Sequence, residues 1–319
     1  MRNRSRSALA STPAGAGATV ESPRADVLLT EARERTDALL ASWADRLRDE
    51  IGGRHGEALA YALRTPGKRV RAALVLAAYR SVGGSSPGIM GVAAAVETVH
   101  AYSLVHDDLP CMDDDDVRRG RPTVHRVYGV RAATAAGLAM VPLAARAAVD
   151  GARALELPPS VGAAILRELM CAAGAGGMIG GQLLDLEAEG EEQSLDALER
   201  IHRGKTGALI AAAARIGGLA ARAPASRVEA LARYGAAVGL AFQIADDVLD
   251  VTATSAELGK TAGKDAAVRK GTYPAMLGIE GARARARSLA DEACRALDAE
   301  GLLTEPLAAL ARFAVERRH

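Results

Sequence analysis

The feature that most constrains the fold is a helical spacing of apolar residues, which runs from about residue 25 to the end of the chain. Apolar side chains recur every three or four positions, the period of one face of an α-helix. Gly and Pro separate the helical segments, and no run of alternating β-branched residues predicts a sheet. The clearest segments are 27–51, 69–81, 90–106, 131–155, 195–216 and 227–251. We therefore expect one all-α domain over residues 25–319, a bundle whose sites project inward from facing helices.

Composition agrees with closely packed helices and excludes several classes of function. Aromatic residues make up only 3% of the chain, whereas strands favour aromatic and β-branched side chains. Forty basic and 39 acidic residues leave a net charge of +1, so no basic field predicts binding to nucleic acid. The apolar stretch 132–145 contains Pro142 and is too short to cross a bilayer, so we expect no membrane span.

Two further features bear on where the protein works. Cys111, Cys171 and Cys294 lie far apart without CxxC spacing, which favours a reducing compartment, and we expect a cytoplasmic protein. Residues 1–24 form a Ser/Ala/Gly/Arg-rich tail with no acidic residue before Glu21, and we expect it to be disordered. This composition is also similar to that of an organelle transit peptide, which leaves open whether the tail is cleaved.

The helical pattern is interrupted at 107–122 by a polar stretch that begins with six aspartates in ten residues. Pro110 has no backbone donor, so we expect it to end the preceding helix and to turn Asp113 back towards Asp107 and Asp108. Carboxylates this dense repel one another unless a cation neutralises them, and Mg²⁺ prefers such oxygen ligands. An acidic run alone is more often a solvated loop, but the three arginines just downstream favour a metal-bridged diphosphate.

A second aspartate cluster lies in a strongly helical segment and comprises Asp246, Asp247 and Asp250. Asp246 and Asp250 are four residues apart and share one helix face. A surface stripe is the simpler interpretation, but carboxylates on an otherwise apolar helix are costly to bury without a partner. Two facing clusters of this kind can hold several Mg²⁺ ions where a pyrophosphate leaves a carbon atom.

Lysine is rare in this chain, with only five examples among the 40 basic residues. Each of them lies beside Gly, Thr or another basic residue, a setting typical of phosphate binding. The five are Lys68, Lys205, Lys260, Lys264 and Lys270. No GxxxxGK[ST] P-loop is present, and each lysine alone is weak evidence. Together with the two aspartate clusters they predict a site for two diphosphates and their metal ions.

These segments, in this order, resemble the trans-isoprenyl diphosphate synthases of the bacterial farnesyl or geranylgeranyl type, over about two thirds of the chain. The matching segments are GKRVR at 67–71, ETVHAYSLVHDDLPCMDDDDVRRGRPTVH at 97–125, GGQLLDL at 180–186, KTGALI at 205–210, GLAFQIADDVLDV at 239–251, ELGKTAGKD from 257 and RKGTYPAMLG from 269. The resemblance implies an isoprenoid-synthase-like helical bundle with a central active-site cavity. It also implies a homodimer, several Mg²⁺ ions per site, and isopentenyl and allylic diphosphates as substrates.

The resemblance further implies roles for individual residues. Mg²⁺ would be held by Asp107, Asp108 and Asp113 on one side and by Asp246, with Asp247 and Asp250 as further candidates, on the other. The allylic diphosphate or the developing cation would contact Arg118, Lys205, Thr206, Gln243 and Lys260. Isopentenyl diphosphate would contact Lys68, Arg71, His100 and Arg119. The implied reaction is ionisation of the allylic diphosphate, attack by the isopentenyl double bond, and loss of a proton to the departing pyrophosphate.

Product length in this family depends on the residues before the first aspartate cluster, which form the floor of the chain cavity. One helical turn rises about 5.4 Å, close to one isoprene unit, so a bulky residue moved by one turn changes the product by one C5 step. Tyr102 lies five residues before Asp107, next to the small Ser103. This arrangement resembles the farnesyl type and favours a C15 product. If Tyr102 is only a core residue, a C20 product is equally compatible.

Three positions depart from the family pattern. Pro66 replaces a glycine, Ala72 replaces a proline, and Leu138 follows Gly137 where the family often has aspartate. None of them removes a predicted metal ligand, so we expect effects on rate and product rather than on the class of reaction. Two other functions stay open: a class I terpene cyclase or head-to-head synthase, and a non-catalytic subunit of a heteromeric synthase. The retained isopentenyl set disfavours a cyclase, and the retained aspartates and lysines disfavour a non-catalytic subunit.

Overall fold

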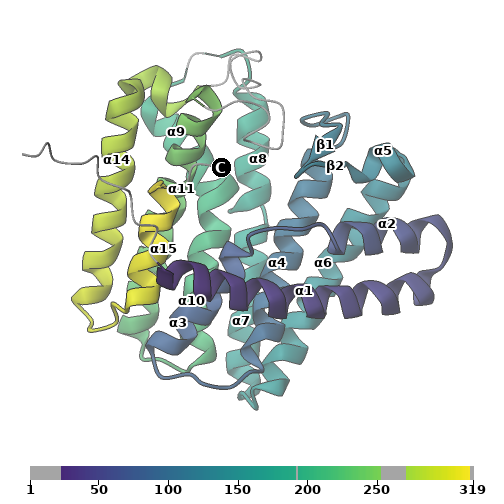
Figure 1. Cartoon of the computed structure of the whole chain (residues 1–319), viewed down its shortest axis with the longest axis horizontal. Coiled ribbons are helices and arrows are strands. Elements are labelled where there is room, and N and C mark those ends of the chain that lie inside the picture. Colours follow the sequence, from purple (N-terminus) through teal and green to yellow (C-terminus); the bar gives the residue numbers. More distant parts are fainter. Residues whose placement is uncertain (1–22, 192, 253–270, 317–319) are drawn as a thin grey trace, which may run out of the picture.

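Nearly every element of the computed structural model is a helix, which confirms the all-α prediction (Figure 1). The structure describes residues 23–191, 193–252 and 271–316. The helices are α1 Pro23–Ile51, α2 Gly53–Leu63, α3 Val70–Ser81, α4 Ile89–Asp107, α5 Val124–Tyr128, α6 Val130–Ala154, α7 Pro159–Ala173, α8 Met178–Glu187, α9 Leu195–His202, α10 Ala208–Ala220, α11 Ala225–Thr252, α14 Tyr273–Asp298 and α15 Glu305–Glu316. Helix α1 begins within the predicted tail, and the rest of that tail lies outside the described residues.

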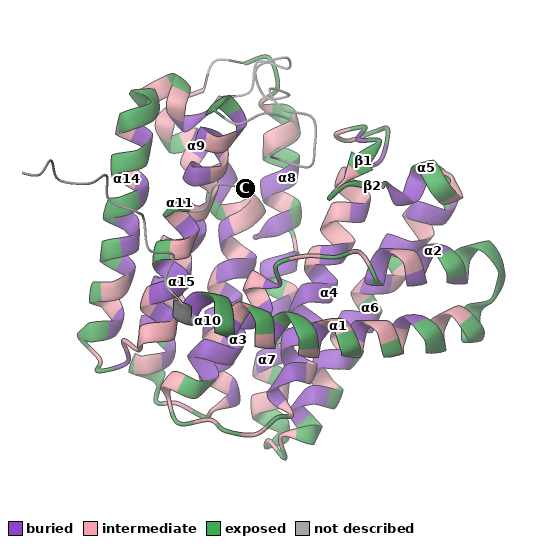
Figure 2. Ribbon diagram, in the orientation of Figure 1, coloured by how far each residue is buried: buried purple, intermediate pink, exposed green. Residues whose placement is uncertain are grey.

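Most of these helices stand side by side, and α1 crosses one face of the bundle with α2 folded back against it (Figure 1). The largest buried cluster joins α3, α4, α10 and α11, with Leu74, Val96, Ile210 and Tyr234 among its members. Buried residues gather where these helices meet (Figure 2). Small residues allow close packing: a Cβ on Gly217 would lie 2.6 Å from the carbonyl oxygen of Val75. The Ala- and Gly-rich composition is therefore used to bring helix backbones together.

Two stretches are long and apolar enough to cross a membrane by length and composition alone. The first is α6, with a mean hydropathy of 1.5 and half of its most apolar window buried. It extends well beyond the 14-residue apolar stretch on which the sequence argument rested. The second, Pro159–Glu187, is interrupted between the end of α7 and the start of α8. Core helices of water-soluble proteins pass the same test, and α6 packs along α4, so this is weak evidence for a membrane protein.

A small β-hairpin is the main departure from the predicted helical pattern. Strand β1 (Val117–Arg118) pairs antiparallel with β2 (Arg121–Pro122). Arg119 and Gly120 form the turn with positive φ angles of 54° and 72°, which matches the twist of a two-residue hairpin. Strands of two residues leave no periodic signal in the sequence. The hairpin lies beyond the carboxyl end of α4 (Figure 1). Its residues Arg118 and Arg119 line a cavity of the site described next.

Candidate active site

The first aspartate cluster lies at the carboxyl end of α4, where the chain turns back on itself. Helix α4 ends at Asp107, and the backbone N–H of Asp113 donates to the carbonyl oxygen of Asp107 at 2.8 Å. The N–H of Asp114 donates to the carbonyl oxygen of Leu109, and Asp114 adopts a φ of 47°. The reversal predicted around Pro110 is confirmed, and it brings the backbones of Asp107 and Asp113 together.

Electrostatics in this loop are unfavourable for the charged carboxylates. The pKa of Asp107 is raised to about 6, mainly by burial; the charges of Asp113 and Asp185 contribute to the rise, whereas those of Lys205 and Arg118 oppose it. Burial also raises the pKa of Asp108 to about 6, although Arg118 opposes the shift. Carboxylates that crowd together in this way are stabilised by a bound cation. The donor set of this loop therefore fits a divalent metal ion.

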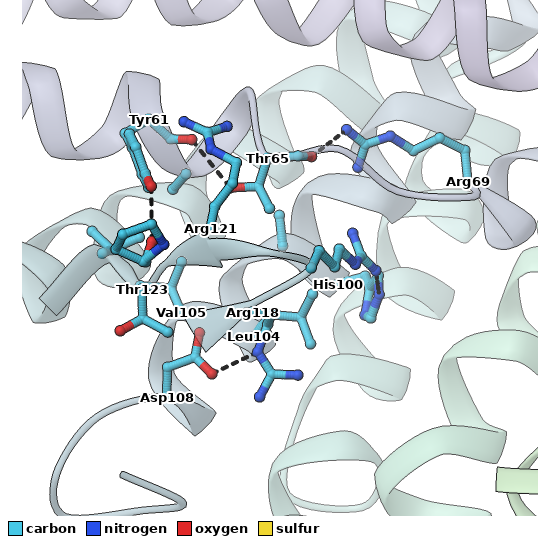
Figure 3. A pocket seen from close by; sticks show the side chains of 15 residues that line it. Tyr61, Thr65, Arg69, His100, Leu104, Val105, Asp108, Arg118, Arg121 and Thr123 are labelled. Carbon is cyan, nitrogen blue, oxygen red and sulfur yellow. Dashed lines mark hydrogen bonds and ion pairs between the residues drawn. The ribbon is translucent and has the colours of Figure 1, made fainter. Parts of the chain in front are cut away.

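Arg118 is tied to the first cluster by two carboxylates. Its Nε donates to Oδ1 of Asp108 at 2.5 Å, and its Nη2 lies 3.4 Å from Oδ2 of Asp115. Both aspartates are buried. Figure 3 shows the Arg118–Asp108 pair beside a cavity of about 30 Å³ between α2, α4 and the hairpin. Asp115 was not among the predicted site residues, and here it orients the arginine that was predicted to contact the allylic diphosphate.

Lys205 and Thr206 lie in a short π-helical turn, Arg203–Gly207, between α9 and α10. The sequence predicted one helical segment over 195–216, whereas the structure has α9, this turn and α10 in succession. Two glycines of neighbouring helices make room for the turn: a Cβ on Gly181 of α8 would collide with the backbone nitrogen of Lys205, and one on Gly239 of α11 would lie 2.8 Å from Cα of Gly207. Single π-helical turns occur frequently at functional sites.

Lys205 forms an ion pair that the sequence reasoning did not predict. Its Nζ lies 2.7 Å from Oδ2 of Asp185 on α8, and both side chains are largely buried. The charges of Lys205 and Asp185 both act on Asp107, which shows that the π-helical turn, α8 and the first aspartate cluster meet in one region. Asp185 is part of the GGQLLDL segment, but no local pattern marks it as the partner of Lys205.

The second aspartate cluster lies on α11, and its three members have different surroundings. Asp246 is partly exposed, whereas Asp247 and Asp250 are buried. Asp247 accepts hydrogen bonds from His202, Gln243 and the backbone of Tyr273. Among the described residues, Oδ2 of Asp250 has no hydrogen-bond partner. A buried carboxylate oxygen without a partner is costly, and a cation would satisfy it.

The predicted isopentenyl diphosphate residues gather where α3 and α4 meet the hairpin. Nη2 of Arg119 lies 3.4 Å from Nε2 of His100, and its Nη1 donates to the carbonyl oxygen of Pro66 at 2.6 Å. The pKa of His100 is lowered well below its usual value, first by burial and then by the charges of four arginines, Arg71 and Arg119 foremost. Lys68 is exposed, with its Nζ 5.5 Å from the centre of the Phe313 ring. Positive charge crowded around a neutral imidazole suits an anionic ligand.

The start of α3 explains one departure from the family pattern. The backbone N–H of Ala72 donates to Oε1 of Glu97 at 3.1 Å, a bond that a proline at this position could not make. Glu97 is 2% exposed, and its other oxygen lies 3.7 Å from Arg69, which is itself buried. The hydrogen bond from Ala72 therefore links the start of α3 to α4, beside Arg71.

Tyr102 lies on α4 between two of the buried clusters and packs against both. Its ring meets that of His106 edge to face, with 5.0 Å between the ring centres. A Cβ on Gly137 of α6 would collide with the same imidazole, so His106 fills the space that this glycine leaves. Ser103 donates its hydroxyl to the carbonyl oxygen of His100 at 2.9 Å. Leu138 is 62% exposed and makes no part of this packing.

Other features stand apart from the predicted set. Carboxylate oxygens of Asp114 and Asp116 and a ring nitrogen of His125 lie within 4.8 Å of one another, but none of the three was a predicted ligand. A larger cavity of about 490 Å³ lies between α1, α4 and α6, and no predicted site residue lines it. Lys260, a predicted allylic contact, lies outside the described residues, as do Lys264 and Lys270.

Comparison with known proteins decides the family. The family model described as "Polyprenyl synthetase" matches residues 54–304, which is most of the chain. The chain belongs to the polyprenyl synthetase family. It is 47% identical over 265 residues to the farnesyl diphosphate synthase of Escherichia coli K12, covering 82% of this chain and 88% of that protein. It is 43% identical to a chloroplastic geranylgeranyl pyrophosphate synthase of Capsicum annuum, covering 82% and 71%.

Solved structures of polyprenyl synthetases show the same fold. An apo FPP/GFPP synthase from Zymomonas mobilis matches with a TM-score of 0.80 and 32% identity, over 91% of this chain and 99% of that one. A geranyltransferase from Helicobacter pylori, solved with magnesium and isoprenyl diphosphate, matches with a TM-score of 0.76 and 28% identity, over 93% and 98%. The relatives include farnesyl and geranylgeranyl synthases, so the family is a prenyltransferase family whose product length differs among its members.

For this polyprenyl synthetase, the structure adds residues that the sequence reasoning missed. Asp185 binds Lys205, Asp115 binds Arg118, Glu97 anchors α3, and His202 binds Asp247. His202 lies three residues before Lys205, and the sequence analysis attached no role to it. For Asp185, Asp115 and Glu97 the only available signal was a polar residue inside a matching segment, and His202 lies just outside one.

Proposed function

We propose that the protein is a short-chain trans-prenyltransferase that condenses isopentenyl diphosphate with dimethylallyl and geranyl diphosphate to farnesyl diphosphate (C15), with release of pyrophosphate. One observation supports the proposal: residues of one π-helical turn interact with both aspartate clusters. The charge of Lys205 lowers the pKa of Asp107 in the first cluster. The next residue, Thr206, donates to Oε1 of Gln243 at 2.8 Å, and Gln243 donates to Asp247 of the second cluster at 3.1 Å. Two carboxylate clusters and a lysine between them suit an allylic diphosphate.

Within this proposal, Mg²⁺ would be held by Asp107, Asp108 and Asp113 on α4 and its loop and by Asp246 and Asp250 on α11. The raised pKa of Asp107 supports a cation at the first cluster. Oδ2 of Asp250, which has no hydrogen-bond partner among the residues that the structure describes, supports one at the second. When bound, Mg²⁺ neutralises the charge that develops on the leaving pyrophosphate. The aspartate side chains of both clusters suit Mg²⁺ because they supply only oxygen ligands.

The chain's own residues then divide the work of the reaction. Arg118 and Lys205 would bind the allylic diphosphate, whose C–O bond breaks with the electron pair leaving on pyrophosphate. Isopentenyl diphosphate would be held at the start of α3, with its double bond placed to attack the allylic carbon. The residues that would hold it are Lys68, Arg71, His100 and Arg119. Because its pKa is lowered, His100 is neutral, and its ring nitrogens can donate and accept hydrogen bonds without adding positive charge. Loss of a proton to the departing pyrophosphate completes the reaction.

Product analysis tests this proposal. The purified protein is incubated with Mg²⁺, isopentenyl diphosphate and, separately, C5, C10 and C15 allylic diphosphates, and the dephosphorylated products are identified by mass. We expect a C15 alcohol that disappears with EDTA. A C20 alcohol would identify a geranylgeranyl diphosphate synthase, the second candidate, which is supported by the similarity to the Capsicum annuum enzyme. No elongation from any starter by the folded protein would contradict prenyl transfer and favour a cyclase or a non-catalytic subunit.

We also propose that the protein is a cytoplasmic homodimer. Val130 and Leu138 on α6 are 48% and 62% exposed, and a second copy of the chain would cover such apolar side chains. Light scattering during size-exclusion chromatography measures the mass directly. A monomer at micromolar concentration would contradict the dimer. Fractionation of cells into membrane and supernatant tests the location.

A further inference from the structure

Asp247 has surroundings unlike those of a metal ligand. It is 3% exposed, and three hydrogen bonds reach its carboxylate. Oδ2 accepts from Nε2 of His202 at 3.1 Å and from the backbone N–H of Tyr273 at 3.1 Å. Oδ1 accepts from Nε2 of Gln243, also at 3.1 Å. A carboxylate offers about four acceptor positions, so most of this one's capacity is used by the protein.

The three partners of Asp247 come from different parts of the chain. His202 is the last residue of α9 and directly precedes the π-helical turn that carries Lys205. Tyr273 is the first residue of α14; its hydroxyl donates to Glu199 at 2.7 Å and its ring stacks on His202. Gln243 lies one turn before Asp247 on α11 itself. One buried carboxylate therefore joins α9, α11 and the start of α14.

Two of these contacts lead directly to the predicted allylic residues. Asp247 takes the N–H side of the Gln243 amide, which leaves Oε1 of Gln243 to accept the hydroxyl proton of Thr206 at 2.8 Å. Asp247 also accepts a hydrogen bond from His202. His202 directly precedes the π-helical turn, so this bond fixes the position at which the turn begins. Since a backbone N–H and a charged carboxylate cannot exchange donor and acceptor roles, this arrangement fixes the direction of every bond in the set.

We propose that Asp247 is a positioning residue for the allylic side and not a metal ligand, and that it acts through Gln243 and His202 on the turn that carries Lys205 and Thr206. This inference rests on the proposed prenyltransferase function and assigns metal binding on α11 to Asp246 and Asp250 alone. It replaces the role that the family resemblance suggested for Asp247.

The substitution Asp247→Asn separates the two roles. The asparagine oxygen can still accept from His202 and Tyr273, but its NH₂ group then faces Nε2 of Gln243. Gln243 must reverse its amide to accept this donor, and Thr206 can then no longer donate to it. The variant keeps its volume and most of its hydrogen bonds, so we expect it to fold, and circular dichroism and thermal unfolding check this.

The matched control is Asp246→Asn, one residue away on the same helix. Binding of Mn²⁺ in the presence of inorganic pyrophosphate is measured by electron paramagnetic resonance, without turnover. We expect Asp246→Asn to weaken Mn²⁺ binding about tenfold or more, and Asp247→Asn to leave it within about twofold of the wild type. Under turnover, Asp247→Asn should lower kcat/KM for the allylic diphosphate about 10–100-fold, with the KM for isopentenyl diphosphate unchanged.

A second pair of variants tests the path through His202. His202→Gln keeps a donor near the position of Nε2, whereas His202→Leu removes it. We expect the glutamine variant to recover at least tenfold of the allylic kcat/KM that the leucine variant loses. Equal loss in both variants would show that the hydrogen bond from residue 202 to Asp247 has no effect on the allylic kcat/KM. That result would overturn the proposed path through His202.

The outcomes separate this inference from the proposed function. If Asp247→Asn weakens Mn²⁺ binding as strongly as Asp246→Asn, Asp247 is a ligand and the inference is wrong. If Asp247→Asn keeps the wild-type allylic kcat/KM, its positioning role is wrong. A wild-type protein that neither binds Mn²⁺ with pyrophosphate nor elongates any starter would overturn the proposed function, and the inference with it.

Discussion

Asp107 should destabilise the metal-free protein at neutral pH, so Asp107→Asn should make that protein more stable while it abolishes turnover. Burial and the neighbouring carboxylates raise the pKa of Asp107 from 3.8 to about 6. A difference of about 2 units corresponds to about 3 kcal/mol between the folded and unfolded chain, and solvent screening reduces it to about 1–3 kcal/mol. Asparagine has nearly the same shape and no charge, so it removes this penalty.

The sign of the pH dependence follows from the direction of the shift. Because the folded protein holds this proton more tightly than the unfolded chain, the penalty is fully present well above pH 6. It falls as the pH decreases through about 6 and vanishes below the unfolded value of 3.8. The stability difference between Asp107→Asn and wild type should therefore be largest at pH 8 and should shrink towards pH 4.5.

Thermal unfolding in EDTA measures this difference. For a chain of this size, 1 kcal/mol shifts Tm by roughly 2–4 °C, so we expect a rise of several degrees at pH 8. Asp114→Asn is the control, because Asp114 is exposed and asparagine tolerates its φ of 47°. Its Tm should change by only about a degree. Mg²⁺ with pyrophosphate should raise the Tm of wild type and not that of Asp107→Asn. An Asp107→Asn variant that is less stable than wild type at pH 8, or a difference that is constant with pH, would refute this reasoning.

Three further variants test other parts of the site. Tyr102→Ala should lengthen the product by one C5 unit, measured by mass, and an unchanged product would show that the cavity floor lies elsewhere. Asp185→Asn removes the charged partner of Lys205, so kcat/KM for the allylic diphosphate should fall about tenfold or more in steady-state kinetics, and wild-type kinetics would contradict this role. Ala72→Pro deletes the N–H that Glu97 accepts and should destabilise the protein by about 1–3 kcal/mol in denaturant unfolding; equal stability would show that the bond contributes nothing.

Local patterns accounted for the helices and for the turn at Pro110. Helical spacing predicted α4 and α11 to within a few residues, because burial of one helix face leaves a periodic signal in the sequence. The absence of a backbone donor at Pro110 predicted the reversal that joins Asp113 to Asp107. These features depend on residues close in sequence, so they are visible without coordinates.

Contacts between distant segments were not visible in the same way. His202 and Asp247 are 45 residues apart, and Lys205 and Asp185 are 20 apart. Their pairing depends on how α8, α9 and α11 pack, which periodicity does not determine. The resemblance treated Asp246, Asp247 and Asp250 as equivalent candidates for metal binding, whereas burial and hydrogen bonding distinguish them.

Helix α4 shows why the two substrate sides of the site belong together. Glu97, His100 and Asp107 follow one another on α4 at intervals of three and seven residues, so they share one helix face. Glu97 anchors the start of α3 beside the residues proposed to bind isopentenyl diphosphate, and Asp107 ends the same helix at the first aspartate cluster. A shift of α3 relative to α4 would therefore move the isopentenyl residues relative to the aspartates. The Ala72–Glu97 bond opposes such a shift. In a chain without the family's proline, this bond is another way to hold the start of α3 at a fixed distance from the aspartates at the end of α4.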